Sequence, residues 1–123
     1  MPSIELNETN FKETYEKNDI VVIDFWAPWC GPCQAFGPIF EEVSDQVTDV
    51  KFGKVNTEVE QGIAAYFQIR SIPTLIIIRD GIELFRHSGM VSANDLGEIV
   101  KKVKEVDMEE VERLIKEEEE KQH

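Results

Sequence analysis

Two cysteines, Cys30 and Cys33, are the only ones in the chain, and two residues separate them. The run Ile20 to Trp26 before them is rich in β-branched and aromatic residues and predicts a strand, whereas residues 34–47 after them predict a helix. Residues three apart at a helix start share one face, with Cβ atoms about 5–6 Å apart. A disulfide requires a separation only slightly shorter than this. The spacing therefore favours a reversible dithiol–disulfide couple.

The start of a helix also changes the chemistry of a thiol. Its unpaired N–H groups and its dipole favour negative charge, which lowers the pKa of a cysteine placed there. Cys30 should gain most, and Cys33, one turn further in, should be the more buried. We therefore expect Cys30 to attack a substrate disulfide and Cys33 to resolve the mixed disulfide. Pro32 suits a helix start because it has no N–H, and Gly31 keeps the approach open.

Half of a zinc site is the alternative interpretation of two cysteines at this spacing. A structural zinc ion needs about four ligands. Apart from the pair, the chain offers only His87 and His123 as further soft donors. We therefore expect no metal site.

Length, composition and charge exclude several other classes of protein. The 123 residues, 41% of them hydrophobic, suit one compact domain with a core. The chain has no apolar run of 18 residues and no N-terminal pattern typical of a signal peptide, so we expect a cytoplasmic protein without a membrane anchor. The net charge of −12 argues against binding to nucleic acid or to an anionic membrane.

Asp24 interrupts the apolar strand that precedes the cysteines. A carboxylate in a strand covered on both faces is costly unless it is paired or protonated. Alternation along the strand places Asp24 on the same face as Val22 and Trp26. The residues alone leave two interpretations open: a proton carrier for the cysteine pair, or a structural acid bonded to backbone or water.

The ten residues from Asp24 to Cys33, DFWAPWCGPC, resemble the active-site motif of thioredoxins of the bacterial and archaeal type. The resemblance extends over about residues 3–104. It implies an α/β protein with the thioredoxin fold, in which a central mixed β-sheet of about five strands carries helices on both faces. We expect a thioredoxin domain over residues 1–106 and, over residues 107–123, an acidic amphipathic extension with one further helix.

The same resemblance suggests roles for two charged residues. It implies that Asp24 is the general acid and base for Cys33, with a pKa raised by desolvation, and that Lys54 lies close to it. On alternation alone Lys54 shares the face of Phe52, so its side chain can point inward. An ordinary surface lysine is the alternative for Lys54.

Downstream matches describe a groove for substrate. In an ordinary strand start, Pro73 would follow a trans peptide bond. The resemblance implies instead that it is cis and packs against the disulfide, that the backbone of Ile72 pairs with substrate, and that Gly89 lets the substrate chain approach. The expected groove residues are Trp29, Gly31, Pro32, Ile72, Pro73 and Gly89.

The resemblance implies a protein-disulfide reductase whose redox couple is Cys30 and Cys33, with no metal and no tightly bound cofactor. Its electrons would come from a flavoprotein thioredoxin reductase, and its substrates would be disulfide-containing proteins. Three rival functions remain open: a disulfide oxidant or isomerase, a non-catalytic thioredoxin-like binding subunit, and a dedicated reductant of one target that is steered by residues 107–123. Gly31 and Pro32 between the thiols are similar to the reducing members of the family.

Several further helices are expected away from the cysteines, among them one over residues 58–67 and one beyond residue 106. Residues 58–67 predict a helix that buries Val59, Ile63 and Phe67. Beyond residue 106, Asp107 and Glu110 have the spacing of a capping box, and a short apolar stripe follows. About half of the net charge lies in residues 105–123, which carry nine acids and three bases. This extension is either an acidic solubilising tail on a monomer or a helix that docks or dimerises.

Overall fold

The computed structural model describes residues 3–122, which form a mixed five-stranded sheet and five helices. The first elements are β1 (Ser3–Glu5), α1 (Phe11–Lys17), β2 (Ile20–Trp26), α2 (Gly31–Gln46) and β3 (Lys51–Asn56). They are followed by α3 (Gln61–Tyr66), β4 (Thr74–Arg79), β5 (Ile82–Ser88), α4 (Ala93–Glu105) and α5 (Met108–Lys121). This order confirms the predicted fold class, including the additional C-terminal helix.

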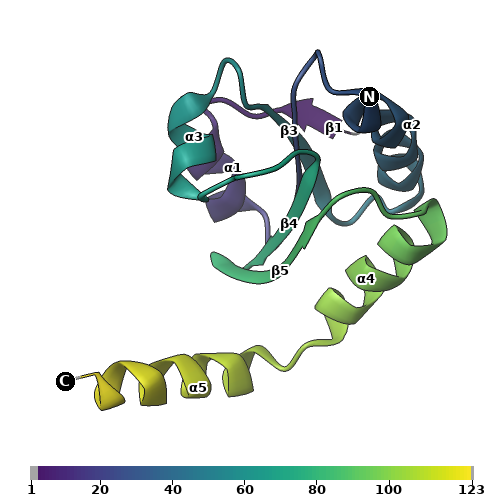
Figure 1. The fold of residues 1–123 in the computed structure, drawn as a ribbon. Coiled ribbons are helices and arrows are strands. Elements are labelled where there is room, and N and C mark those ends of the chain that lie inside the picture. Colours follow the sequence, from purple (N-terminus) through teal and green to yellow (C-terminus); the bar gives the residue numbers. More distant parts are fainter. Residues whose placement is uncertain (1–2, 123) are drawn as a thin grey trace.

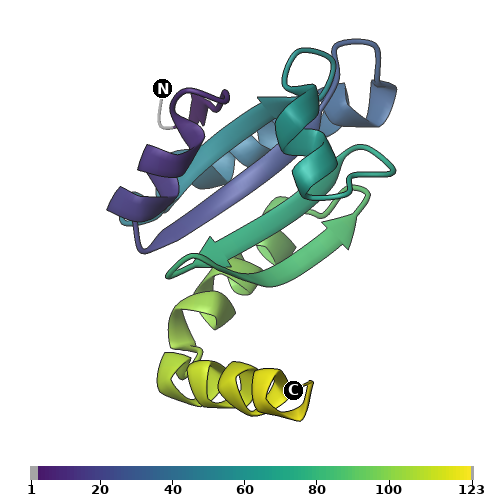
Figure 2. The ribbon, with the colours of Figure 1, turned by 90° about the vertical axis from the view of Figure 1, so that its left-hand side faces the viewer.

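β2 is the central strand of a sheet with the order β1-β3-β2-β4-β5. It runs parallel to β3 and antiparallel to β4. Helices α1 and α3 cover one face of the sheet, and α2 and α4 cover the other (Figures 1 and 2). Every residue from Ile20 to Phe25 is buried, because both faces of the strand are covered. The apolar sequence of β2 is typical of such a position.

The two faces of β2 contribute to separate parts of the core. Val22 packs with Phe36 and Phe40 of α2. Val21 and Ile23 belong to a second cluster on the side of α1 and α3. Since side chains alternate along a strand, Asp24 points to the same side as Val22, beneath α2.

The helix predicted over residues 58–67 is shorter than expected. α3 spans Gln61–Tyr66, and Val59, which we expected to be buried, is 70% exposed. The carbonyl of Asn56 accepts hydrogen bonds from the N–H groups of Val59 and Glu60, at 3.1 and 2.8 Å. This turn after β3 occupies the residues where the helix was expected to begin, so apolar spacing alone placed the helix start too early.

Arg79, at the end of β4, holds the C-terminal end of α4. Its Nη1 donates to the carbonyl oxygens of Val103 at 2.8 Å, Lys104 at 3.1 Å and Val106 at 2.8 Å. The last carbonyls of a helix have no partner within the helix, and they carry partial negative charge. The guanidinium therefore satisfies them and favours the end of α4 at this point.

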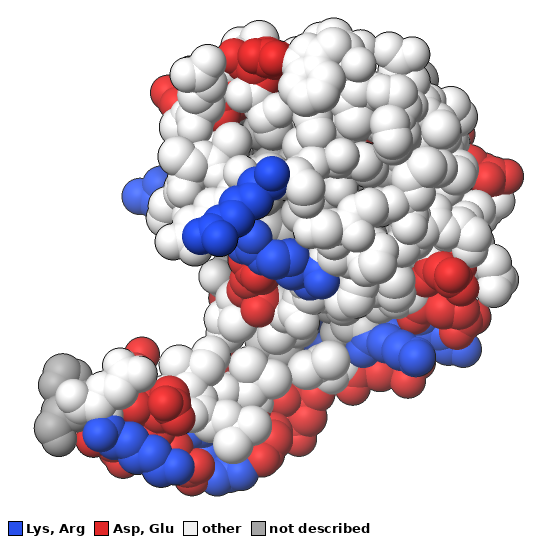
Figure 3. Space-filling model, viewed as in Figure 1, with Lys and Arg blue, Asp and Glu red and all other residues white. Residues whose placement is uncertain are grey.

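α5 begins immediately after this anchor and projects away from the sheet. Asp107 caps it by accepting hydrogen bonds from the backbone N–H groups of Glu109 and Glu110, at 3.1 and 3.2 Å. None of its residues is buried. It lies at the end of the molecule remote from the start of α2 (Figures 1 and 2). Figure 3 shows charged side chains crowded over α4 and α5, whereas the body above them is largely uncharged on this face.

No helix among residues 3–122 combines the length and apolar character that a membrane crossing needs.

Arg79→Met should destabilise the fold by about 2 kcal/mol, because the loss of charged hydrogen bonds leaves several helix-end carbonyls without a partner. Urea unfolding of the oxidised protein measures the change. Arg70→Met, at an exposed position, removes the same charge and serves as the control. Equal stability of the two variants would contradict the anchoring role.

Candidate active site

Cys30 and Cys33 form a disulfide across the first turn of α2, with their Cα atoms 5.2 Å apart. That distance lies within the ordinary range for disulfides. Cys30 is the N-cap residue, and its Sγ accepts a hydrogen bond from the backbone N–H of Cys33 at 3.2 Å. Cys30 is 5% exposed and Cys33 is 3% exposed. The expected contrast in burial is therefore present but small.

A second loop lies against the disulfide from the start of β4. The peptide bond between Ile72 and Pro73 is cis, and the carbonyl oxygen of Ile72 lies 3.8 Å from the Sγ of Cys30. Ile72 packs with Ala27 and both cysteines. The loop thus presents the backbone carbonyl of Ile72 beside the Sγ of Cys30, the outer of the two sulfurs.

A third loop, at the end of β5, joins the second. The N–H of Gly89 donates to the carbonyl of Pro73 at 2.8 Å. Gly89 has a φ of 103°, a conformation that residues with a side chain rarely adopt. The sequence-predicted residues Cys30, Ile72, Pro73 and Gly89 therefore meet at one edge of the sheet.

The remaining predicted groove residues form the open side of this site. Gly31 and Pro32 are exposed, and nothing lies within 4 Å of the position that a side chain on Gly31 would take. Trp29 is 69% exposed, and its indole N–H donates to the carboxylate of Glu58. An apolar ring next to the outer sulfur is thereby held in place while it remains accessible.

Sequence reasoning missed two residues that support this open side. Glu58 follows β3 and lies 29 positions from Trp29, so no local pattern indicated their contact. Gln34 folds back from α2, and its Nε2 donates to the carbonyl of Pro28 at 2.7 Å. Its place in the first turn of a helix was the only indication of such a contact.

Asp24 is fully buried, at 0% exposed. Within residues 3–122, neither of its carboxylate oxygens has a hydrogen-bond partner. Burial raises the pKa of Asp24 to about 7, while the charge of Lys54 lowers it and the charge of Glu41 raises it further. A carboxyl group in this state can both hold and release a proton near neutral pH.

Lys54 lies beside Asp24 on the neighbouring strand. The two residues are register partners in the parallel pair of β2 and β3. The Nζ of Lys54 sits 5.0 Å from the centre of the Trp26 ring. It is also 3.6 Å from the position that a Cβ on Gly37 of α2 would occupy. The side chain therefore runs under α2, as the face shared with Phe52 predicted.

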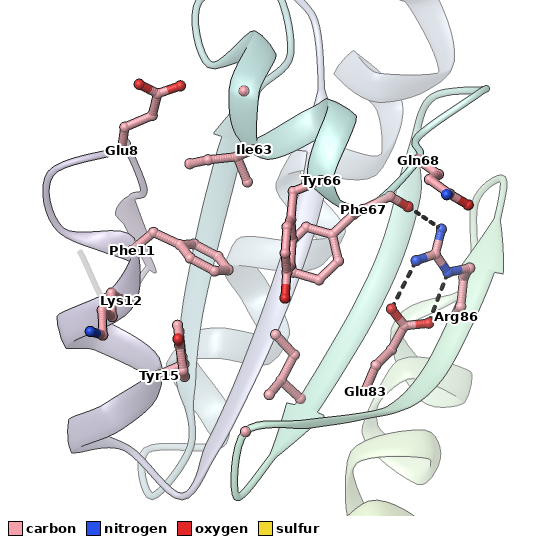
Figure 4. Close-up of a pocket in the computed structure, with 13 residues that line it drawn as sticks. Glu8, Phe11, Lys12, Tyr15, Ile63, Tyr66, Phe67, Gln68, Glu83 and Arg86 are labelled. Carbon is pink, nitrogen blue, oxygen red and sulfur yellow. Dashed lines mark hydrogen bonds and ion pairs between the residues drawn. The ribbon is translucent and has the colours of Figure 1, made fainter. Parts of the chain in front are cut away.

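A separate cavity of about 720 Å³ opens between α1, α3 and the turn that joins β4 to β5. Figure 4 shows Phe11, Tyr15 and Tyr66 around it, with Arg86 at one side paired to Glu83 at 2.8 Å. None of the predicted site residues lines this cavity. It is distinct from the surface around the disulfide.

Metal ligands do not gather in the described part of the chain: residues 3–122 contain no group of three or more His, Cys, Asp or Glu side chains arranged to hold an ion.

The sequence and the structure are both similar to known thioredoxins. A family model described as Thioredoxin matches residues 2–105. "Putative thioredoxin 2" of Streptomyces coelicolor is 40% identical over 115 residues, which are 94% of this chain and 86% of that protein. A thioredoxin of Mycoplasmoides gallisepticum is 40% identical over 95 residues, or 77% of this chain and 95% of that protein.

Solved structures agree with this result. A mutant thioredoxin of Halobacterium salinarum superposes with a TM-score of 0.77 at 28% identity, covering 81% of this chain and 88% of that one. A reduced thioredoxin of Schistosoma mansoni superposes with a TM-score of 0.75 at 32% identity, covering 83% of this chain and 98% of that one. The chain therefore belongs to the thioredoxin family, and Cys30 and Cys33 are the redox couple of a thiol–disulfide oxidoreductase of the protein-disulfide reductase type.

Proposed function

We propose that the chain reduces disulfides in proteins, with Cys30 as the attacking thiol and Cys33 as the resolving thiol. The observation that carries this proposal is the disulfide in the first turn of α2, where the backbone N–H of Cys33 points at the sulfur of Cys30. A hydrogen bond to a sulfur favours its ionised form. The helix start adds a favourable field for the same charge.

The reaction proceeds by two exchanges of sulfur–sulfur bonds. The Cys30 thiolate attacks one substrate sulfur, a mixed disulfide forms, and the other substrate sulfur leaves as a thiolate. The Cys33 thiolate then attacks the Sγ of Cys30, so that the internal disulfide forms and the second substrate sulfur leaves. The substrate gains two electrons, and a flavoprotein thioredoxin reductase restores the two thiols with two electrons from NADPH.

Asp24 is the proton carrier of the second exchange. Cys33 must lose its proton before it can attack, and Asp24 lies beneath the helix that carries Cys33. With a pKa of about 7, its carboxylate is present in a substantial fraction at neutral pH and can take up that proton. Lys54 assists by supplying positive charge next to the carboxylate.

The groove for substrate is formed by Trp29, Gly31, Pro32, Ile72, Pro73 and Gly89. An extended substrate segment would pair with the backbone at Ile72, whose carbonyl lies beside Cys30. Trp29 offers an exposed apolar ring on the other side of the sulfur. This arrangement suits protein substrates that differ in sequence, because main-chain contacts do not depend on side chains.

The chain divides into a thioredoxin domain over residues 1–106 and an acidic extension over residues 107–123. The family match ends at residue 105, and α5 has no buried residue, which supports this boundary. The extension is a solubilising helix. The protein acts as a monomer in the cytoplasm, without a tightly bound cofactor and without contact with nucleic acid or membrane. Its dense negative charge favours solvation over self-association.

A coupled assay tests the central proposal. With NADPH, a thioredoxin reductase and a disulfide-bonded protein such as insulin, the wild type should turn over, whereas Cys30→Ser should fall to background and Cys33→Ser should accumulate the mixed disulfide. Lys101→Ala, at an exposed position of α4, is the matched control. Absence of turnover by the wild type would indicate a non-catalytic binding subunit, turnover retained in Cys30→Ser would contradict the role of Cys30, and an equilibrium potential above that of glutathione would indicate an oxidant.

Asp24→Asn should stabilise the oxidised protein at high pH. The folded pKa of about 7 exceeds the ordinary value of 3.8, so the folded state binds more protons than the unfolded state between these values. Stability contributed by protonated Asp24 is therefore lost as pH rises through this window, by up to about 4 kcal/mol at roughly 1.36 kcal/mol per pKa unit. Urea unfolding at pH 4 and pH 8 should show the advantage of the variant only at pH 8. The same advantage at both values would rule out a raised pKa.

Removal of residues 107–123 tests the role of the extension. The truncated chain should remain a monomer with unchanged turnover in the coupled assay, because no residue of α5 is buried and α5 lies far from the start of α2 (Figure 1), where Cys30 and Cys33 are placed. Sedimentation equilibrium of both chains at several concentrations measures this. A full-length dimer that becomes a monomer on truncation would show that α5 is a dimerisation helix instead.

A further inference from the structure

Glu41 of α2 is a second carboxylate whose charge acts on the buried acid Asp24. Its Oε1 accepts a hydrogen bond from the hydroxyl of Ser3, whereas its Oε2 is buried and has no partner within residues 3–122. A buried carboxylate oxygen without a partner is costly. The hydrogen bond from Ser3 accounts for Oε1 of Glu41 but not for Oε2.

The fold brings Glu41 toward the same lysine that lies beside Asp24. Gly37 and Glu41 are one turn apart, so they share a face of α2. The space beside Gly37 is where the Nζ of Lys54 lies. On the sheet side, β1 pairs with β3 and places Ser3 next to Phe52. We call the group Asp24, Lys54, Glu41 and Ser3 the α2 seam.

Few charged groups face Asp24 within the α2 seam. β3 contributes Lys54 and α2 contributes Glu41, the two residues whose charges act on the carboxyl of Asp24. The partner on β4 is the apolar Leu75. β1 contributes Glu5, the register partner of Lys54, which is exposed to water. When the disulfide is reduced, the thiol of Cys33 becomes a further titratable group of α2, whereas Glu42 and Asp45 of the same helix are exposed to water.

The charges of the two seam residues act on Asp24 in opposite directions. Lys54 favours the ionised form of Asp24, and Glu41 disfavours it. No carboxylate oxygen in the described chain lies within ion-pair distance of Lys54. Its ammonium therefore does not lock Asp24 in the ionised form, and the negative charge of Glu41 offsets part of its field.

We propose that Glu41 is a positioning residue for the redox reaction, whose negative charge, one turn of α2 beyond the point where Gly37 meets Lys54, keeps Asp24 able both to take up and to return a proton near neutral pH. The proposal rests on the proposed role of Asp24 as proton carrier. It assigns a reason for the unpartnered Oε2 of Glu41: the charge of this carboxylate acts through Asp24, without contact with substrate.

Glu41→Gln tests the proposal because it removes the charge, keeps the shape and can still accept the hydrogen bond from Ser3. The carboxyl carbon of Asp24 is titrated by NMR in the oxidised protein, which requires no reductase and no turnover. The titration midpoint should shift to lower pH, since a like charge has been removed. Glu42→Gln, at the exposed neighbouring position of α2, changes the net charge equally and should leave the midpoint in place.

Two further measurements separate an electrostatic role from a structural one. Glu41→Asp keeps the charge and should hold the midpoint near that of the wild type, while Glu41→Ala is a second neutral variant if Glu41→Gln folds poorly. The pH profile of mixed-disulfide resolution should shift in Glu41→Gln but not when Asp24→Asn is also present. Equal midpoints in Glu41→Gln and Glu42→Gln, or a shift that persists with Asp24→Asn, would overturn the proposal, whatever the coupled assay shows.

Discussion

The contact between the start of α2 and the end of β2 is the constraint on which the rest of the structure depends. β2 is buried on both faces, so its position within the sheet is fixed. The chain therefore emerges from the end of β2 at a fixed point. The helix that follows begins at Cys30, and its first turn closes the disulfide. The same helix then covers the face of β2 that carries Asp24. This packing arrangement thus places the two sulfurs at the start of α2, next to its unpaired N–H groups. It also buries Asp24 away from water.

Burial has opposite effects on the two kinds of reactive group. For the sulfurs, the N–H groups at the helix start compensate for reduced solvation by favouring negative charge. For Asp24 no donor compensates, since neither oxygen is hydrogen-bonded within the described chain, and its pKa rises to about 7. The site therefore combines a place that favours an anion with one that disfavours it. A general acid or base is most effective when its pKa lies near the operating pH, and burial brings Asp24 to that range.

The end of the molecule remote from the disulfide has different chemistry. There the guanidinium of Arg79 satisfies the carbonyls at the end of α4, and α5 continues as a highly charged helix in which no residue is buried (Figure 3). Charge accumulates where no substrate groove lies, while the proposed groove residues are themselves uncharged. The net charge of the chain therefore says more about the extension than about the partners of the redox site.

From the sequence by itself, the redox pair and the order of the elements could be determined, because each depends on local spacing, and strand alternation showed that Lys54 shares a face with Phe52 while leaving an ordinary surface lysine as the alternative. Asp24 stood out for the same reason, as a charge within an apolar strand. The tertiary structure alone decided which distant segments meet: Glu58 with Trp29, Arg79 with the end of α4, and Glu41 with the seam beneath α2. It also decided the early turn that leaves Val59 exposed. Those contacts join residues far apart in the chain, and their formation depends on how whole elements pack rather than on any pattern within one of them.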